Sequence, residues 1–188
     1  MGKILIQLLL SASPVIVAAI FHMIIVKLHW FKSFSYPLDH YRHFQGKRIF
    51  GDHKTYRGLL VMIVFSIAFT YLYFLLLKYQ YLSSDNNLLD FSNYSVLTYG
   101  MIFGVGYVFG ELPNSFMKRQ LNIDSGKANH FWLHLLDQID SVLLIMLLLV
   151  FFSDFNWIHF VVGVFFYGFI HLSINYILFL VGLRKEAF

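Results

Sequence analysis

The sequence predicts an all-α, polytopic membrane protein, a bundle of about five transmembrane helices that forms a single domain over residues 1–188. Three observations predict this fold. The 188 residues are 59% hydrophobic and only 13% charged, whereas a soluble domain has roughly 25% charged residues. Several apolar runs are long enough to cross a hydrocarbon core of ~30 Å. The charged residues gather between these runs and not within them.

The first apolar run covers residues 4–26 and contains Pro14 and His22. Proline removes a backbone donor, so we expect this helix to be interrupted or kinked near Pro14. A cleaved signal peptide is the competing interpretation, because Lys3 precedes the apolar stretch and small residues follow it. The run nevertheless continues for about ten further apolar residues, which favours an uncleaved helix.

The other apolar runs predict four more helices. The third contains two G-x-x-x-G spacings, Gly100/Gly104 and Gly106/Gly110, and we favour close helix packing as their role. The fourth is short and begins directly behind Asp137 and Asp140. The expected helices after the first comprise residues 58–77, 94–112, 139–153 and 157–183.

The distribution of Lys and Arg predicts the orientation of the bundle. An odd number of spans places the termini on opposite sides, and basic residues mark the cytoplasmic side. Of the 14 Lys and Arg residues, all except Lys3 and Lys78 lie in or beside two expected loops, 28–57 and 113–138, or in the C-terminal tail. We therefore expect an external N-terminus, a cytoplasmic C-terminus, and a multi-pass protein of the cell (inner) membrane. The net charge of +4 is explained by the basic residues that mark the cytoplasmic side, so no nucleic-acid partner is expected.

The first expected loop ends in a segment, residues 46–58, that suits a polyphosphate and a metal ion. Glycines admit a ligand close to backbone N–H groups, Lys and Arg neutralise phosphate oxygens, and a carboxylate holds Mg²⁺. A basic segment that only fixes topology or touches anionic lipid is the alternative; an acidic and a hydroxyl side chain among the cations weigh against it. The residues concerned are Gly46, Lys47, Arg48, Gly51, Asp52, Lys54, Thr55, Arg57 and Gly58.

The second expected loop adds a pair of carboxylates and further cations. Asp137 and Asp140 stand at positions i and i+3, which are neighbours on one helix face. Two carboxylates at that spacing repel each other unless a cation lies between them, so a divalent metal is one interpretation. The other is a solvated pair favoured by the helix dipole, and the residues alone leave both open. Asn114, Ser115, Lys118 and Arg119 begin the same loop.

Three polar residues lie inside or at the end of the apolar runs. Glu111 closes the third, and it is either a further acid of the site or an exposed helix end. His171 and Asn175, one turn apart in the fifth, face the bundle interior, where they either serve the site or form interhelical hydrogen bonds. The absence of cysteine excludes thiolate catalysis and Cys-ligated metals.

At these motifs the sequence resembles the CDP-archaeol synthase family, relatives of CDP-diacylglycerol synthases. The resemblance covers most of the chain. Its first motif carries His53 and Tyr56 where the family typically has glycine and tryptophan, and Glu111 stands where aspartate is common. The matching segments are Pro37 with Asp39, 46–48, 51–58, 115–119, 136–140, His171 with Asn175, and 183–186.

The resemblance implies a CTP-dependent cytidylyltransferase that converts a lipid phosphate, of the archaetidic or phosphatidic acid type, and CTP to a CDP-lipid and pyrophosphate. It implies Mg²⁺ as cofactor, bound by Asp52, Asp137 and Asp140, with Glu111 as a further acid. Phosphate-binding catalytic residues would be Lys54, Arg57, Lys118 and Arg119. Nucleotide contacts would come from Gly51, Thr55, Asn114 and Ser115.

Two alternatives remain beside this interpretation. A CTP-dependent polyprenol or phytol kinase would release CDP and a lipid phosphate. A transporter or structural membrane protein would need its basic loops only for orientation, but no chain of ionisable residues crosses the bilayer as a relay requires. The sequence leaves the identity of the lipid chains open, and also the oligomeric state, for which a homodimer is one arrangement.

Overall fold

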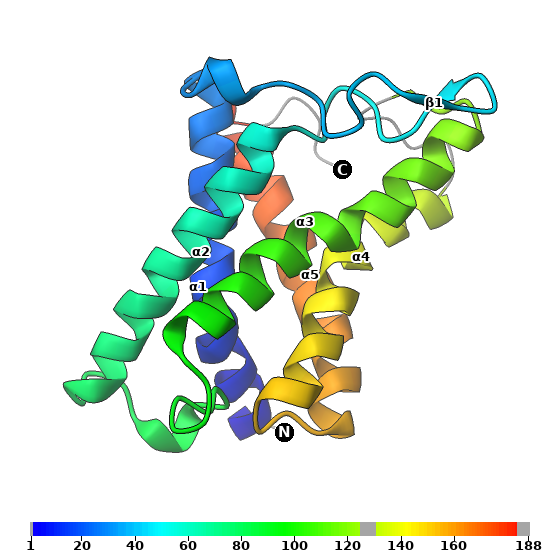
Figure 1. Cartoon of the computed structure of the whole chain (residues 1–188). Helices are drawn as coiled ribbons and strands as arrows, with labels where there is room; N and C mark the ends of the chain where they lie inside the picture. The colour runs from blue at the N-terminus through cyan, green and yellow to red at the C-terminus, as the bar shows by residue number, and fades with distance from the viewer. Residues whose placement is uncertain (1, 125–130, 184–188) are drawn as a thin grey trace.

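The computed structural model describes residues 2–124 and 131–183, and within them five long helices form a bundle (Figure 1). Each contains a stretch long and apolar enough to cross a membrane. The expected all-α membrane bundle is therefore confirmed. The helices are α1 (Gly2–Lys27), α2 (Tyr56–Lys78), α3 (Val96–Gln120), α4 (Phe131–Phe152) and α5 (Trp157–Leu180).

The two ends of the bundle differ in chemistry. We call the end that carries residues 28–55 the basic end, and the end that carries residues 79–95 the opposite end. Lys27 Nζ donates to the carbonyl oxygen of Gly182 at 2.8 Å, so α1 and α5 both end at the basic end. α1 begins at the opposite end (Figure 1), where Gln7 Nε2 donates to the carbonyl oxygen of Asp85 at 3.1 Å. Within the described residues, the odd number of spans thus places the start of α1 and the end of α5 at opposite ends of the bundle.

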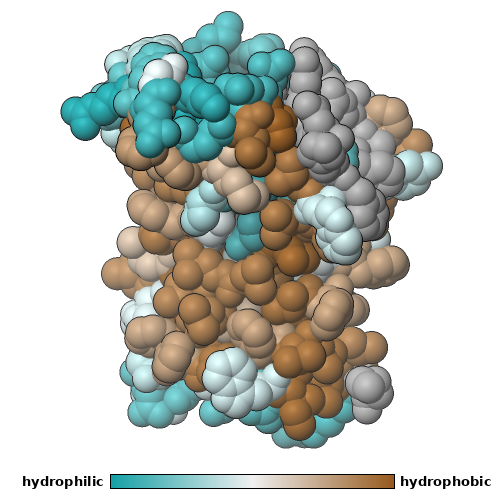
Figure 2. All heavy atoms as spheres, turned by 90° about the vertical axis from the view of Figure 1, so that its right-hand side faces the viewer, coloured by the Kyte–Doolittle hydropathy of each residue, from teal (hydrophilic) through white to brown (hydrophobic). Residues whose placement is uncertain are grey.

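The surface of the bundle is layered by hydropathy. On the face drawn in Figure 2, hydrophobic side chains form a broad band between two hydrophilic ends. Large apolar side chains of the membrane-spanning helices are exposed, among them Phe165 at 76% and Phe169 at 67%. Exposure of so many large apolar side chains indicates that lipid, and not water, surrounds this band.

Helix α3 runs between α2 and α4, and its glycines permit close contact on both sides. A Cβ added at Gly104 would lie 2.5 Å from Ile63 Cα in α2, and one added at Gly110 would lie 2.7 Å from Ser141 Cα in α4. Any side chain at either position would force the backbones apart. The expectation that these glycines serve packing is confirmed.

Helix α1 continues through Pro14, so the expected interruption is wrong. Proline at this position leaves the carbonyl oxygen of Leu10 without its usual backbone donor. The Ser13 hydroxyl donates to that oxygen at 2.7 Å. A neighbouring side chain therefore replaces the missing hydrogen bond and the helix is maintained.

The boundaries of the third and fourth helices also differ from expectation. α3 runs to Gln120 and α4 begins at Phe131, so most of the expected loop 113–138 is helical. Lys118 and Asp137, two of the charged residues that suggested a loop, are instead paired across the two helices. The other helix ends lie within about three residues of their expected positions, the usual uncertainty of such boundaries.

The segment before α2 folds over the basic end. Strands β1 (His43–Phe44) and β2 (Lys47–Arg48) form an antiparallel hairpin. The two residues of its turn, Gln45 and Gly46, have positive φ angles of 50° and 77°, as a type I′ turn requires. Lys47 Nζ donates to the carbonyl oxygen of Gln120 at 2.5 Å, which fixes the hairpin against the end of α3. Short 3-10 helices η1 (Lys32–Phe34) and η2 (Ser84–Asn86) complete the connections.

Candidate active site

Asp39 organises the loop at the basic end. Its side chain is fully buried, and Arg48 donates to it from Nε at 3.1 Å and from Nη2 at 2.8 Å. The backbone N–H groups of Tyr41, Phe50 and Gly51 donate to the same carboxylate at 3.0–3.1 Å. This single side chain therefore holds both the hairpin and the glycine turn at position 51.

The electrostatics of Asp39 agree with this arrangement. Burial alone would raise the pKa of its carboxyl, but the hydrogen bonds from Arg48 and from the backbone outweigh burial and lower the pKa to about 2. The pKa of Arg48 is raised, chiefly because it donates to Asp39. The pair is therefore ionised throughout the physiological range.

An open cavity of about 640 Å³ lies between this loop and the end of α3. Its walls combine glycine backbone, cations and polar side chains, so it can accept a water-soluble anion of nucleotide size. Arg119, whose exposure is only 9%, is one of its lining residues. The lining residues are His43, Gly46, Lys47, Arg48, Gly51, Asp52, His53, Arg119, Asn122, Ile123 and Asp124.

A second polar cluster joins α3 to α4 beside this cavity. Asn114 Nδ2 donates to Asp137 Oδ1 at 2.7 Å and to Asp140 Oδ2 at 2.9 Å. Lys118 Nζ donates to Asp137 Oδ1 at 2.6 Å. Asn114 and Lys118 are buried. We call Asn114, Lys118, Asp137 and Asp140 the carboxylate cluster.

Lys54 and Glu111 form an ion pair between the loop and α3, and each side chain retains little solvent exposure, 23% and 21%. Burial would lower the pKa of the Lys54 ammonium, but the charge and hydrogen bond of Glu111, with weaker attraction from Asp140 and Asp137, raise it above its usual value. Lys54 is thus linked electrostatically to the carboxylate cluster. Glu111 lies inside α3 and not at its end, so an exposed helix end is ruled out as its role.

The remaining predicted site residues lie around the carboxylate cluster and the Lys54–Glu111 pair, but they do not all meet at one point. Asp52 is 70% exposed at its side chain and pairs with Arg48 at 2.9 Å. The Thr55 hydroxyl oxygen accepts from the Gly58 N–H at 3.2 Å and caps α2. Arg57 Nη1 donates to the carbonyl oxygen of Trp30 at 3.3 Å.

Two further residues complete the set on α3. Ser115 follows Asn114 there and is partly buried, and Arg119 interacts electrostatically with Asp52 and Asp137. Arg119 therefore lies between the loop and the carboxylate cluster. Lys127 of the second loop, and Arg184 and Lys185 of the tail, lie outside the described residues.

The carboxylate cluster fits a hard divalent cation. Asn114 Oδ1 is buried and accepts no hydrogen bond within the described ranges, and it lies on the side chain that already contacts Asp137 and Asp140. Carboxylate and amide oxygens are the ligands that Mg²⁺ prefers. Over residues 2–124 and 131–183, no group of three His, Cys, Asp or Glu side chains is assembled for a metal. The full set of Asp52, Asp137, Asp140 and Glu111 thus stays a prediction.

The structure adds residues that the sequence analysis did not place in the site. In the sequence, Asp39 belongs to one of the matching segments, with Pro37, and only the cations and glycines that follow it indicate a role at the site. Gln138 had no signal, because its role depends on α5: its side chain accepts from Asn175 at 3.0 Å, and its carbonyl oxygen lies 3.0 Å from His171 Nδ1. His171 and Asn175 therefore make interhelical hydrogen bonds, as one interpretation expected.

Comparison with known proteins gives one consistent family. A family model described as "CarS-like: CDP-archaeol synthase" matches residues 3–188. A CDP-archaeol synthase of Pyrobaculum aerophilum is 29% identical over 161 residues, which cover 85% of this chain and 84% of that protein. A CDP-archaeol synthase of Methanococcoides burtonii is 30% identical over 151 residues, which cover 75% and 83%.

One solved structure has the same fold. It is described as an intramembrane enzyme for archaeal membrane lipids biosynthesis, and it superposes with a TM-score of 0.63 over 89% of this chain and 91% of that chain, at 21% sequence identity. At that identity the likeness concerns the arrangement of helices.

Proposed function

The chain belongs to the CarS-like family of CDP-archaeol synthases, and from that membership we propose that it transfers the cytidylyl group of CTP to a membrane lipid phosphate. The products are a CDP-activated lipid and pyrophosphate. The observation that carries the proposal is the meeting of two features at the basic end: an open, cationic cavity of nucleotide size and a partly buried carboxylate cluster near it.

The reaction needs positioning and charge neutralisation more than a strong base. The second pKa of a phosphate monoester is about 6, so its oxygen is already ionised and nucleophilic at pH 7. That oxygen forms a bond to the α-phosphorus of CTP, while the bond from this phosphorus to the bridging oxygen breaks and pyrophosphate leaves. Negative charge moves onto pyrophosphate, and cations aimed at it lower the barrier.

The side chains divide this work by location. Arg119 lines the cavity with the Gly51 backbone, and both would contact the CTP phosphates. Lys54 and Lys118, held by Glu111 and Asp137, would neutralise charge where the two substrates meet. Arg57, Thr55 and Ser115 would supply further phosphate contacts from the membrane surface.

Mg²⁺ would be held by Asp137 and Asp140 with the amide oxygen of Asn114, and would neutralise phosphate charge when bound. Glu111 would hold Lys54 beside Asp137 and Asp140. Asp52 would act from the wall of the cavity that it lines. In the structure, hydrogen bonds from Lys118 and Asn114 hold Asp137 and Asp140 close together, although both carboxylates are negatively charged.

The basic end would face the cytoplasm, where CTP is available, while the lipid phosphate stays in the adjoining leaflet. This orientation rests on the distribution of Lys and Arg.

The experiment that tests the proposal uses purified protein with CTP, Mg²⁺ and a panel of archaetidic, phosphatidic and polyprenyl phosphates, with products identified by mass. A cytidylyltransferase yields a CDP-lipid and an equal amount of pyrophosphate. A lipid alcohol added in a parallel reaction reports the kinase alternative, which would release CDP and a new lipid phosphate. Product formation in that parallel reaction, without a CDP-lipid in the first, would overturn the proposal.

A further inference from the structure

His22 is an ionisable side chain within a membrane-spanning helix. It lies on α1, five residues before that helix ends at Lys27. At a rise of about 1.5 Å per residue, it is about 8 Å inside the basic end. Ionisable side chains at such positions are rare, and they usually face the interior of the bundle and serve a function. The surroundings of His22 indicate which function that is.

The imidazole of His22 faces the start of α2. A Cβ added at Gly58 would lie 3.4 Å from His22 Nε2, so the missing side chain leaves this nitrogen uncovered on that side. The residue is partly buried, and within residues 2–124 and 131–183 neither ring nitrogen has a hydrogen-bond partner. Polar groups away from bulk water are normally hydrogen-bonded. The imidazole can therefore accept a ligand.

Two cations and one acid lie near His22. Lys54, Arg57 and Glu111 all interact electrostatically with its imidazole. Lys54 is paired with Glu111, whereas no carboxylate among the described residues pairs with Arg57, and its Nε is buried without a hydrogen-bond partner there. Positive charge and N–H donors are thus in excess at this place, which suits an anion.

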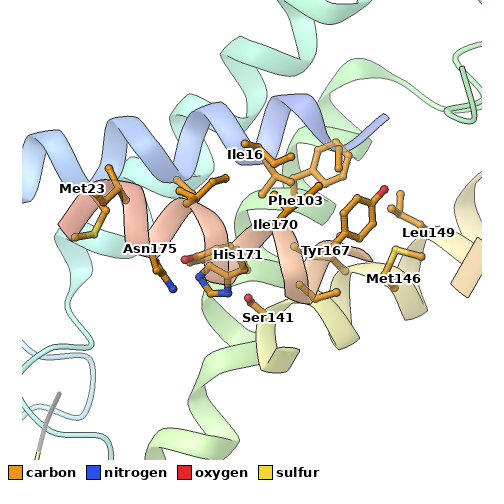
Figure 3. A pocket seen from close by; sticks show the side chains of 18 residues that line it. Ile16, Met23, Phe103, Ser141, Met146, Leu149, Tyr167, Ile170, His171 and Asn175 are labelled. Carbon is orange, nitrogen blue, oxygen red and sulfur yellow. The ribbon is translucent and has the colours of Figure 1, made fainter. Parts of the chain in front are cut away.

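His171, the other histidine near Glu111, has a different environment. It lies on α5 near Ser141 of α4 (Figure 3) and also interacts electrostatically with Glu111. Its Nδ1 lies 3.0 Å from the carbonyl oxygen of Gln138. An interhelical contact therefore explains the place of His171 in the bundle, and no such contact explains that of His22 within the described residues.

The position of His22 favours a lipid phosphate over the phosphates of CTP. Neither His22 nor Lys54 nor Arg57 lines the open cavity in which we place CTP. His22 belongs to a spanning helix, and Lys54 belongs to the loop that precedes α2, so the imidazole lies on the membrane side. A phosphate attached to a lipid approaches from the leaflet, whereas CTP approaches from water.

We propose that His22 donates a hydrogen bond from Nε2 to the lipid phosphate, next to Arg57 and Lys54. The two cations supply charge, and the imidazole supplies a directional donor on the membrane side. The inference rests on the proposed function, because that function brings a lipid phosphate to the basic end.

Substitution of His22 tests this contact through the two Michaelis constants. His22→Phe keeps a ring but has no donor, so KM for archaetidic acid should rise about tenfold and KM for CTP should stay unchanged. His29→Asn replaces an exposed imidazole just beyond α1 and should change neither constant. An unchanged KM for archaetidic acid in His22→Phe, or an equal rise in both constants, would overturn the proposal.

A matched pair of polar substitutions covers the case in which His22→Phe does not fold. The side-chain nitrogen of Gln reaches the position of Nε2, whereas that of Asn reaches only the position of Nδ1. His22→Gln should therefore keep a KM for archaetidic acid close to that of the wild type, and His22→Asn should raise it about tenfold. If the two variants behave alike, a donor at Nε2 is not what binds the phosphate.

Equilibrium binding without CTP separates this inference from the proposed function. The probes are archaetidic acid and archaeol, which have the same chains and differ in the phosphate. Wild-type protein should prefer archaetidic acid, and His22→Asn should lose about tenfold of that preference. If the loss occurs and no CDP-lipid forms, the contact is right and the reaction is a different one. If a CDP-lipid forms and the preference is absent or unchanged by the substitution, the inference about His22 alone is wrong.

Discussion

Lys54 and Glu111, which are 57 positions apart in the chain, form an ion pair that joins the loop at the basic end to helix α3. Removing one partner of such a pair leaves the other charge without compensation, at a cost of about 3 kcal/mol. We expect Lys54→Met to lower the thermal stability of the detergent-solubilised protein and to abolish product formation.

The double variant Lys54→Met/Glu111→Leu separates these two effects. Removal of both charges should restore most of the stability, because no buried charge is left unpaired. Product formation should stay absent, since the cation that we propose to bind phosphate is still missing. Recovery of activity in the double variant would show that Lys54 has only a structural role.

The Asn114 side chain should influence how tightly Mg²⁺ binds. Asn114→Ala removes the donor to both aspartates and the buried oxygen that has no other partner. We expect the Mg²⁺ concentration for half-maximal activity to rise about tenfold, in the range known for groups that orient metal ligands. Titration of activity against Mg²⁺ measures this concentration. The control is Asn93→Ala, which changes an exposed residue at the opposite end. An unchanged Mg²⁺ requirement would remove Asn114 from the metal site.

Asp39 should stabilise its loop in a pH-dependent manner. A carboxyl whose pKa is lower in the folded than in the unfolded protein stabilises the fold above the unfolded pKa, and the effect disappears as pH falls. With a folded pKa of about 2, Asp39 should contribute fully above pH ~4 and lose its contribution between pH ~4 and ~2. Hydrogen exchange of the loop amides across this range measures the loss.

At neutral pH the corresponding substitution is Asp39→Asn. It should reduce protection of the Phe50 and Gly51 amides by roughly 2 kcal/mol, since both donate to this carboxylate. Asp52→Asn changes an exposed carboxylate of the same loop and should leave the two amides protected. If both variants behave alike, Asp39 does not organise the loop.

The orientation of the bundle can be tested because the chain has no cysteine. Ser33→Cys lies at the basic end and Ser84→Cys at the opposite end, and both positions are exposed. In intact cells, a membrane-impermeant maleimide should label Ser84→Cys only, and in opened membranes it should label both. Labelling of Ser33→Cys alone in intact cells would reverse the orientation.

Hydropathy predicted the five spans because each apolar run is long enough by itself. Hydropathy did not predict where α3 ends and where α4 begins, because a charged residue lowers hydropathy whether or not a partner neutralises it. Lys118 and Asp137 neutralise each other across the two helices, and the helices therefore continue. Likewise, the sequence shows the proline in α1 but not that Ser13 replaces its hydrogen bond.

The pairings within the candidate site could not be predicted from the sequence. Cations, glycines and carboxylates in two segments predict a phosphate and metal site, and this assignment stays a prediction. Which carboxylate meets which cation depends on tertiary approach: Asp52 pairs with Arg48, and Lys54 reaches Glu111 on another helix. The depth at which Asp39 is buried had no sequence signal of its own.

Asp137→Asn tests whether the carboxylate cluster on α3 and α4 performs CTP-dependent transfer. The substitution keeps the size of the side chain but removes the charge that Lys118 and a metal would share. The measurement is the mass-identified CDP-lipid formed from CTP, Mg²⁺ and lipid phosphate by equal amounts of folded wild-type and variant protein. We predict a product that appears with pyrophosphate in the wild type and is lost in the variant. Substantial CDP-lipid from Asp137→Asn would show that the carboxylate cluster does not perform the transfer.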